Sequence, residues 1–72
     1  MIRVLFVRVE FNQIKQYKRM DLGFRPNLRD VIMWELDQDS TIPTRVYSIE
    51  IVTQHTIFDS NIDDVDIIAY TE

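Results

Sequence analysis

The 72-residue chain has no cysteine, a single glycine, two prolines and one histidine. Without cysteine it forms no disulfide, and one histidine alone cannot build a structural zinc site. One glycine excludes a glycine-rich phosphate-binding loop. No apolar run reaches the roughly 20 residues that span a membrane. We expect no metal and no cofactor, so a domain of this size must be stabilised by its core or by a dimer interface.

Hydrophobic residues make up 46% of the chain and aromatic residues 11%, which is enough for a core and argues against disorder. The first residues, MIRVLFVRVEF, interrupt an apolar run with Arg3 and Arg8 and contain no small-residue cleavage site, so they indicate a strand and not a signal peptide. The lack of cysteine is compatible with a reducing compartment. We predict a single domain over residues 1–72, located in the cytoplasm.

Charge is distributed unevenly along the chain. Residues 1–29 carry seven of the eight basic side chains and two acids, whereas residues 30–72 carry one base and ten acids. The two parts have balances of +5 and −9, which give the net charge of −4. Asymmetry of this kind bears on partners and on self-association. Basic and aromatic residues are interleaved near the N-terminus. A domain with a pI near 4.8 nevertheless lacks the basic surface of most nucleic-acid-binding domains, so we expect no direct nucleic-acid binding.

Residues 2–24 predict a β-hairpin. Residues 2–11 are first apolar on both faces and then alternate between apolar and polar, which is typical of a strand inside a sheet. Asn12 and Gln13 mark a turn, and residues 14–24 alternate again up to the region of Gly23.

The next segment has the spacing of a helix. Asn27 follows Pro26 as a suitable N-cap, and Asp30 falls at the third helical position. The apolar residues that recur at helical spacing are Leu28, Val31, Ile32 and Leu36. The sequence therefore predicts a helix over residues 27–37, with Met33 and Trp34 beside its packed face.

The rest of the chain predicts a loop over residues 38–44, a strand over 45–58, a turn at 59–61 and a final strand over 64–70. The expected fold class is α+β, a single mixed β-sheet with one helix packed across it, in the order β-β-α-β-β. We expect the helix to pack on four residues of the sheet, namely Leu5, Val7, Ile49 and Ile67.

This order of elements resembles the β-grasp (ubiquitin-like) arrangement. The hairpin from Ile2 to Phe24, the capped helix from Asn27 to Asp37 and the closing strand from Asp64 to Ile68 carry the resemblance. It implies that the first and last strands lie side by side and parallel at the centre of the sheet. The Gly-Gly tail that this family uses for conjugation or sulfur transfer has no counterpart in the sequence, so the resemblance concerns fold and not activity.

Candidate catalytic motifs lack the context that their chemistry needs. Residues 37–41 (DQDST) match the DxDxT motif of haloacid-dehalogenase-type phosphatases, but that motif follows a strand in a large α/β domain. Residues 59–63 (DSNID) begin like a calcium loop, yet Asp64 and Tyr70 replace the glycine and glutamate that the loop requires. Nothing places a serine on a strained turn near His55. We expect no enzymatic activity.

Acidic residues are the strongest candidates for a partner-binding site. One group lies near the end of the predicted helix, where the helix dipole disfavours negative charge. The other is crowded before the last strand. The candidate residues are Glu35, Asp37, Asp39, Asp59, Asp63, Asp64 and Asp66. The alternative is a solvated face that only gives solubility.

We therefore predict a non-enzymatic interaction protein that binds a basic protein surface through its acids, such as the DNA-binding surface of another protein. In size, acidity and lack of cysteine the chain is similar to the small host-takeover proteins of bacteriophages, several of which mimic the charge of DNA. The alternative is a ubiquitin-like adaptor or homodimeric structural module that binds through apolar residues such as Trp34, Met33 and Phe58. We also expect self-association, as a homodimer, because so small a domain needs further apolar burial.

Overall fold

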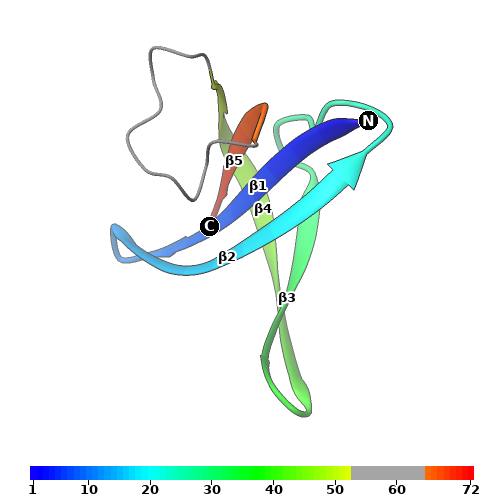
Figure 1. The fold of residues 1–72 in the computed structure, drawn as a ribbon. Coiled ribbons are helices and arrows are strands. Elements are labelled where there is room, and N and C mark those ends of the chain that lie inside the picture. Colours follow the sequence, from blue (N-terminus) through cyan, green and yellow to red (C-terminus); the bar gives the residue numbers. More distant parts are fainter. Residues whose placement is uncertain (53–64) are drawn as a thin grey trace.

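The computed structural model describes residues 1–52 and 65–72, and within these residues the protein is made of strands without a helix (Figure 1). The strands are β1 (Ile2–Glu10), β2 (Gln13–Leu22), β3 (Val31–Asp37), β4 (Ser40–Ile51) and β5 (Ile67–Thr71). The predicted α+β class is therefore wrong, because the predicted helix is replaced by β3.

The five strands form one mixed sheet in the order β2-β1-β5-β4-β3. β1 pairs with β5 in parallel, from Val4 opposite Ile67 to Arg8 opposite Thr71, and the other neighbours are antiparallel. The expectation that the first and last strands lie adjacent and parallel is confirmed. Both strands are buried on their two faces, which explains why their sequences are apolar with little alternation.

The segment predicted to be a helix is extended because its side chains alternate in burial. Trp34 is 1% exposed and Ile32 is partly buried, whereas Val31 and Met33 are about half exposed at 51% and 49%. β4 has the matching alternation, with Thr44 and the residues two positions to either side of it turned inward. β-branched and aromatic residues favour such a pleated, half-buried strand.

Three of the four residues assigned to the helix face are exposed and not core residues, namely Val31 and two others. Leu28 is 58% exposed in the connection before β3, and Leu36 is 49% exposed near the end of β3. Residues 38–44, predicted to be a loop, instead form a turn at Gln38 and Asp39 and the first part of β4. The turn predicted at 59–61 lies outside the described residues.

The first hairpin has the predicted position. Its turn places Phe11 and Asn12 at φ values of 52° and 61°, so both central residues have the left-handed backbone of a type I′ turn. Asn12 adopts this conformation easily, whereas Phe11 does so at some cost and is itself 86% exposed.

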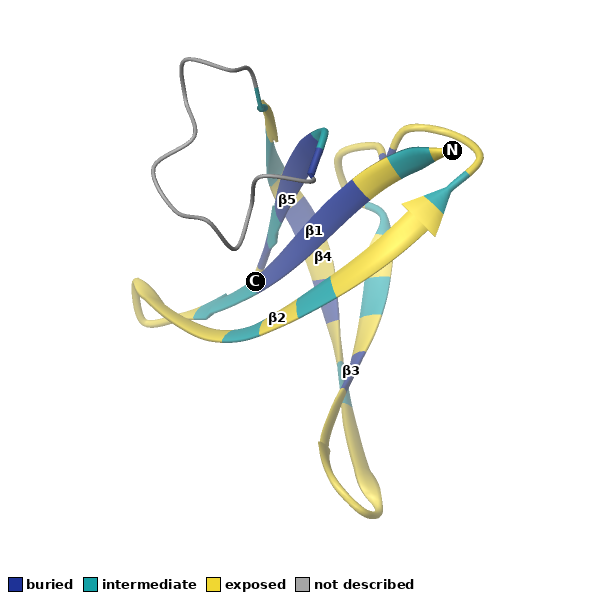
Figure 2. Ribbon diagram, viewed as in Figure 1, coloured by how far each residue is buried: buried dark blue, intermediate teal, exposed yellow. Residues whose placement is uncertain are grey.

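The core lies on both faces of β1 and β5. The inner cluster joins residues of β1, β3, β4 and β5, and comprises Val4, Phe6, Trp34, Val46, Ile67 and Ala69. The outer cluster comprises Leu5, Val7, Val65 and Ile68. Figure 2 shows this buried centre and the exposed ends of the two hairpins.

Side chains close the curl of the sheet. β2 and β3 are the two ends of the strand order, yet Lys18 Nζ donates to the Met33 carbonyl at 2.8 Å and Gln16 Nε2 donates to the Glu35 carbonyl at 3.0 Å. The Lys18 ammonium also lies 5.4 Å from the centroid of the Trp34 ring. These contacts cover carbonyls on the edge of β3 that another chain could otherwise bind.

Candidate functional site

The end of the β3–β4 hairpin projects from the body of the sheet (Figure 1). The β4–β5 ladder begins at Val46, and Arg45 exchanges backbone hydrogen bonds with Glu72, so the part of β4 before Arg45 is paired with β3 alone. Every residue from 35 to 41 is exposed (Figure 2). We call residues 35–41 the acidic arm, because they include Glu35, Asp37 and Asp39.

The three acids are exposed on the strand end and the turn of this hairpin. A register shift between Glu35 and Asp37 inserts an extra residue into β3 beside the turn. The Asp39 backbone N–H donates to Asp37 Oδ1 at 3.2 Å, which stabilises the turn in the manner of an Asx turn. Among residues 1–52 and 65–72, no cationic side chain forms an ion pair with any of the three. The arm therefore carries uncompensated negative charge.

Asp66 is placed differently and has a structural role. Its Oδ2 accepts from the Arg3 backbone N–H at 2.9 Å, and its Oδ1 lies 3.1 Å from Arg3 Nη2. The Asp66 backbone N–H in turn donates to the Arg3 carbonyl at 2.8 Å. The side-chain hydrogen bond from Arg3, and then its backbone hydrogen bond, hold the pKa of Asp66 below the ordinary value of 3.8.

The structure does not bring Asp66 to the acidic arm. The Val52 backbone N–H donates to the Asp66 carbonyl, at the far end of β4 from the arm. The other three candidates, Asp59, Asp63 and Asp64, lie outside the described residues, as do His55 and Phe58. Of the seven acids selected from the sequence, the structure therefore places three on the acidic arm and one, Asp66, away from it.

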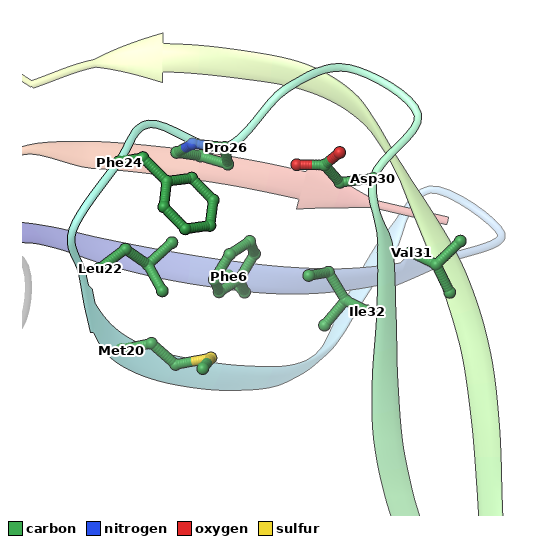
Figure 3. A pocket seen from close by; sticks show the side chains of 8 residues that line it. All are labelled: Phe6, Met20, Leu22, Phe24, Pro26, Asp30, Val31 and Ile32. Carbon is green, nitrogen blue, oxygen red and sulfur yellow. The ribbon is translucent and has the colours of Figure 1, made fainter.

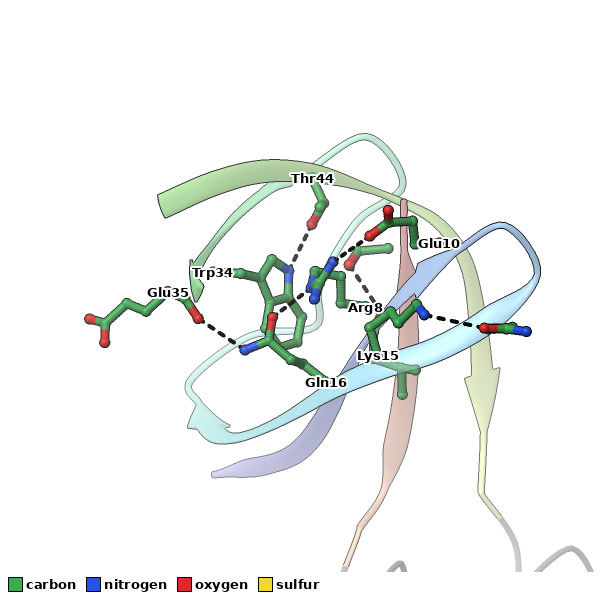
Figure 4. Close-up of polar contacts among 10 residues, drawn as sticks. Arg8, Glu10, Lys15, Gln16, Trp34, Glu35 and Thr44 are labelled. Atoms are coloured by element: carbon green, nitrogen blue, oxygen red, sulfur yellow. Dashed lines mark hydrogen bonds and ion pairs between the residues drawn. The ribbon is translucent and has the colours of Figure 1, made fainter. Parts of the chain in front are cut away.

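Besides Arg3, the basic residues Arg8 and Lys18 also make contacts within the fold, and the sequence analysis did not identify this role. Arg8 is largely covered, with 11% of its side chain exposed, and donates from Nε to Gln16 Oε1 at 2.6 Å and from Nη1 to Glu10 Oε2 at 3.0 Å (Figure 4). Lys18 is bound to β3. Both residues lie on the inward face of their strands, at the same two-residue spacing as apolar residues that pack in the core. That spacing was the signal in the sequence that these two basic side chains face inward.

Trp34 cannot serve as an apolar contact for a partner, because it is buried. Its indole N–H donates to Thr44 Oγ1 at 2.8 Å (Figure 4). The Thr44 hydroxyl in turn donates to the Ile32 carbonyl at 3.3 Å. Burying a tryptophan with its N–H satisfied is typical of a core residue. This corrects the expectation that Trp34 forms part of an exposed binding surface.

An apolar groove lies between the end of β2 and the start of β3. Its volume is about 340 Å³. The lining residues are Phe6, Met20, Leu22, Phe24, Pro26, Asp30, Val31 and Ile32 (Figure 3). Phe24 and Met20 are 67% and 41% exposed, and the single carboxylate, Asp30, accepts the Asn27 backbone N–H at 2.8 Å. The groove can take an apolar side chain, but it offers few polar groups that would fix a small molecule.

The described residues contain no group of three metal-ligating side chains. The DxDxT segment begins at Asp37, the last residue of β3, and continues through the hairpin turn into β4, so it follows a strand of an antiparallel hairpin and not a strand of a large α/β domain. Within the same residues, no helix has the length and apolar character needed to cross a bilayer. No protein family, curated protein or solved structure matches the chain.

Proposed function

We propose that this protein is a non-enzymatic interaction module that binds a basic protein surface through its acidic arm. The observation that supports this most directly is the exposure of Glu35, Asp37 and Asp39 on a projecting hairpin without cationic partners among the described residues. Charge of one sign on a narrow projection steers encounter with the opposite charge and favours correct partners over wrong ones.

The binding surface that we propose comprises the acidic arm and leaves out Asp66. Asp66 is bound to Arg3 and lies away from the arm, so it is not included. A hairpin tip with three acids fits a basic groove, and the DNA-binding surface of a host protein is the class of partner that we propose. The cytoplasm is the location that we propose, in keeping with the absence of cysteine.

A second candidate is an adaptor that binds through the apolar groove. It is favoured by the exposed Phe24 and Met20 above a buried Phe6. Exposed apolar residues around a depression are typical of protein-binding sites. Because apolar contacts respond little to ionic strength and charged contacts weaken with it, salt dependence separates the two candidates.

The test uses an arginine- and lysine-rich peptide and measures its binding by fluorescence anisotropy at low and high ionic strength. Asp37→Lys combined with Asp39→Lys should weaken binding about tenfold or more at low ionic strength, since attraction is replaced by repulsion. The matched control is Asp21→Lys with Glu72→Lys, which changes the net charge equally at two exposed positions outside the arm. It should keep most of the affinity.

The proposal is wrong if the arm variant binds as tightly as the parent protein. An affinity that does not change with ionic strength and is lost in the variant Phe24→Ser would favour the apolar adaptor. A pull-down from a bacterial lysate at two salt concentrations, with the parent and the arm variant side by side, would then identify the natural partner.

A further inference from the structure

The outward face of the β3–β4 hairpin forms a strip that is distinct from both the core and the apolar groove. Three cross-strand pairs follow one another along it: Val31 opposite Arg45, Met33 opposite Pro43, and Glu35 opposite Thr41. All six residues are exposed. We call these six residues the outer strip. Its opposite face carries Trp34 and belongs to the core.

Chemically, the outer strip is polarised. Arg45 stands at one end, where its Nη1 donates to the Arg29 backbone carbonyl at 3.4 Å and its backbone exchanges two hydrogen bonds with Glu72. Glu35 stands at the other end, followed by Asp37 on the acidic arm. Between the ends lie Met33 and Pro43, with Met33 49% exposed. The strip thus runs from positive through apolar to negative.

Such an order is what a two-fold symmetric contact requires. In an isologous interface, a contact between one residue of the first copy and a different residue of the second copy occurs twice, with the roles of the two copies exchanged. A two-fold axis along the row of Met33 and Pro43 would stack two outer strips face to face with their strands antiparallel. The Glu35 end of one copy would then meet the Arg45 end of the other, twice, while the two Met33 side chains met at the centre.

Edge-to-edge pairing of β3 is the competing way for two copies to join through this hairpin. Gln16 and Lys18 donate to the Glu35 and Met33 carbonyls and so occupy hydrogen-bond acceptors on that edge. A partner strand would have to displace both side chains. The face of the hairpin, in contrast, is open.

We propose that the outer strip is a self-association surface, and that the basic surface bound by the Glu35 end is the Arg45 end of a second copy. This rests on the proposed function in so far as the acidic arm must be available for binding. Two strands of three residues are small beside the roughly 800 Å² per partner of stable complexes, so the dimer is weak and reversible. Dissociation would free the arm for another basic partner.

The test is a set of charge reversals followed by sedimentation equilibrium, which distinguishes the 8.7 kDa monomer from the dimer. Glu35→Arg leaves two basic ends, and Arg45→Glu leaves two acidic ends. Each should weaken the dimer about tenfold or more, because both symmetric contacts become repulsive. Lys15→Glu, an exposed reversal on β2, is the control and should leave the dimer unchanged.

Restoration is the decisive part of the experiment. The double variant Glu35→Arg with Arg45→Glu should recover the dimer, and an equimolar mixture of the two single variants should form a heterodimer. Glu35 and Arg45 are two cross-strand rows apart, about 14 Å along the hairpin, so a new pair within one chain cannot explain recovery. Met33→Lys should abolish the dimer by placing two like charges at the axis.

A parent protein that stays monomeric at high concentration would overturn the inference, as would single variants that dimerise like the parent or a double variant that does not recover. The peptide assay, run below the concentration at which dimers form, tests the proposed function separately. Peptide binding through Asp37 and Asp39 by a strictly monomeric protein would support the proposed function while refuting self-association. A strip-dependent dimer that binds no basic peptide would support self-association while refuting the proposed function.

Discussion

Replacing Trp34 with alanine should remove most of the stability of this protein. The indole is 1% exposed, lies in the inner cluster and donates its N–H to Thr44. Truncating a buried tryptophan to alanine costs about 3–5 kcal/mol. A domain of 72 residues has a total free energy of unfolding of about 4–11 kcal/mol at the usual value per residue. We expect Trp34→Ala to lie close to the limit of folding.

The conservative variant Trp34→Phe separates packing from hydrogen bonding. It keeps a large ring but removes the N–H donor, and Thr44 retains the Ile32 carbonyl as a partner for its hydroxyl. The expected cost is therefore about 1–2 kcal/mol. Met33→Ala, at the neighbouring and half-exposed position, is the control and should cost less than about 1 kcal/mol.

Urea unfolding followed by far-ultraviolet circular dichroism measures all three variants, because it does not depend on tryptophan fluorescence. The expected ranking depends on the alternation of β3, which turns Trp34 inward and Met33 outward. An unfolding midpoint of Trp34→Ala equal to that of the parent, or a Met33→Ala cost larger than that of Trp34→Ala, would refute this assignment.

Two further predictions follow from the same structure. Leu36→Ala should lower the melting temperature far less than Ile32→Ala, since Leu36 is 49% exposed on the arm whereas Ile32 packs against the inner cluster; equal effects of the two would contradict the strand. Arg3 lowers the pKa of Asp66 below 3.8, so the stability that this carboxylate contributes is present above that pH and is lost as the pH falls through the lower folded value. The difference in stability between the parent and Asp66→Asn should thus be constant near neutral pH and shrink in acid, and a pH-independent difference in urea titrations would exclude the pair as its source.

Local pattern was sufficient to identify the two strands of the first hairpin and the last strand. Residues 2–11 and 14–24 repeat with the two-residue period of a strand, and Asn12 supplies the turn. The central position of β1 and β5 was also predictable, because strands that are apolar on both faces belong at the centre of a sheet, and their adjacent, parallel pairing was the expectation from the β-grasp resemblance.

Residues 28–36 could not be assigned by pattern, because they satisfy two periods at once. Leu28, Val31, Ile32 and Leu36 have helical spacing, while Ile32 and Trp34 have the spacing of a strand. The choice depends on residues distant in sequence: β4 offers a complementary strand, and β1 and β5 offer the apolar wall against which Trp34 packs. The sequence of residues 28–36 alone carries no information about the residues of β1 and β5 on which they pack, and this tertiary packing overrides the local propensity.

In the candidate site too, some features follow from the sequence and others from the tertiary structure. The nearness of Glu35, Asp37 and Asp39 along the chain can be read from the sequence. Their projection on a hairpin, the binding of Asp66 to Arg3 at the other end of β4, and the outward position of Arg45 on the same strip as Glu35 depend on how the strands pair. A count of charges along the chain does not show which way each side chain faces, whereas the pairing of the strands does.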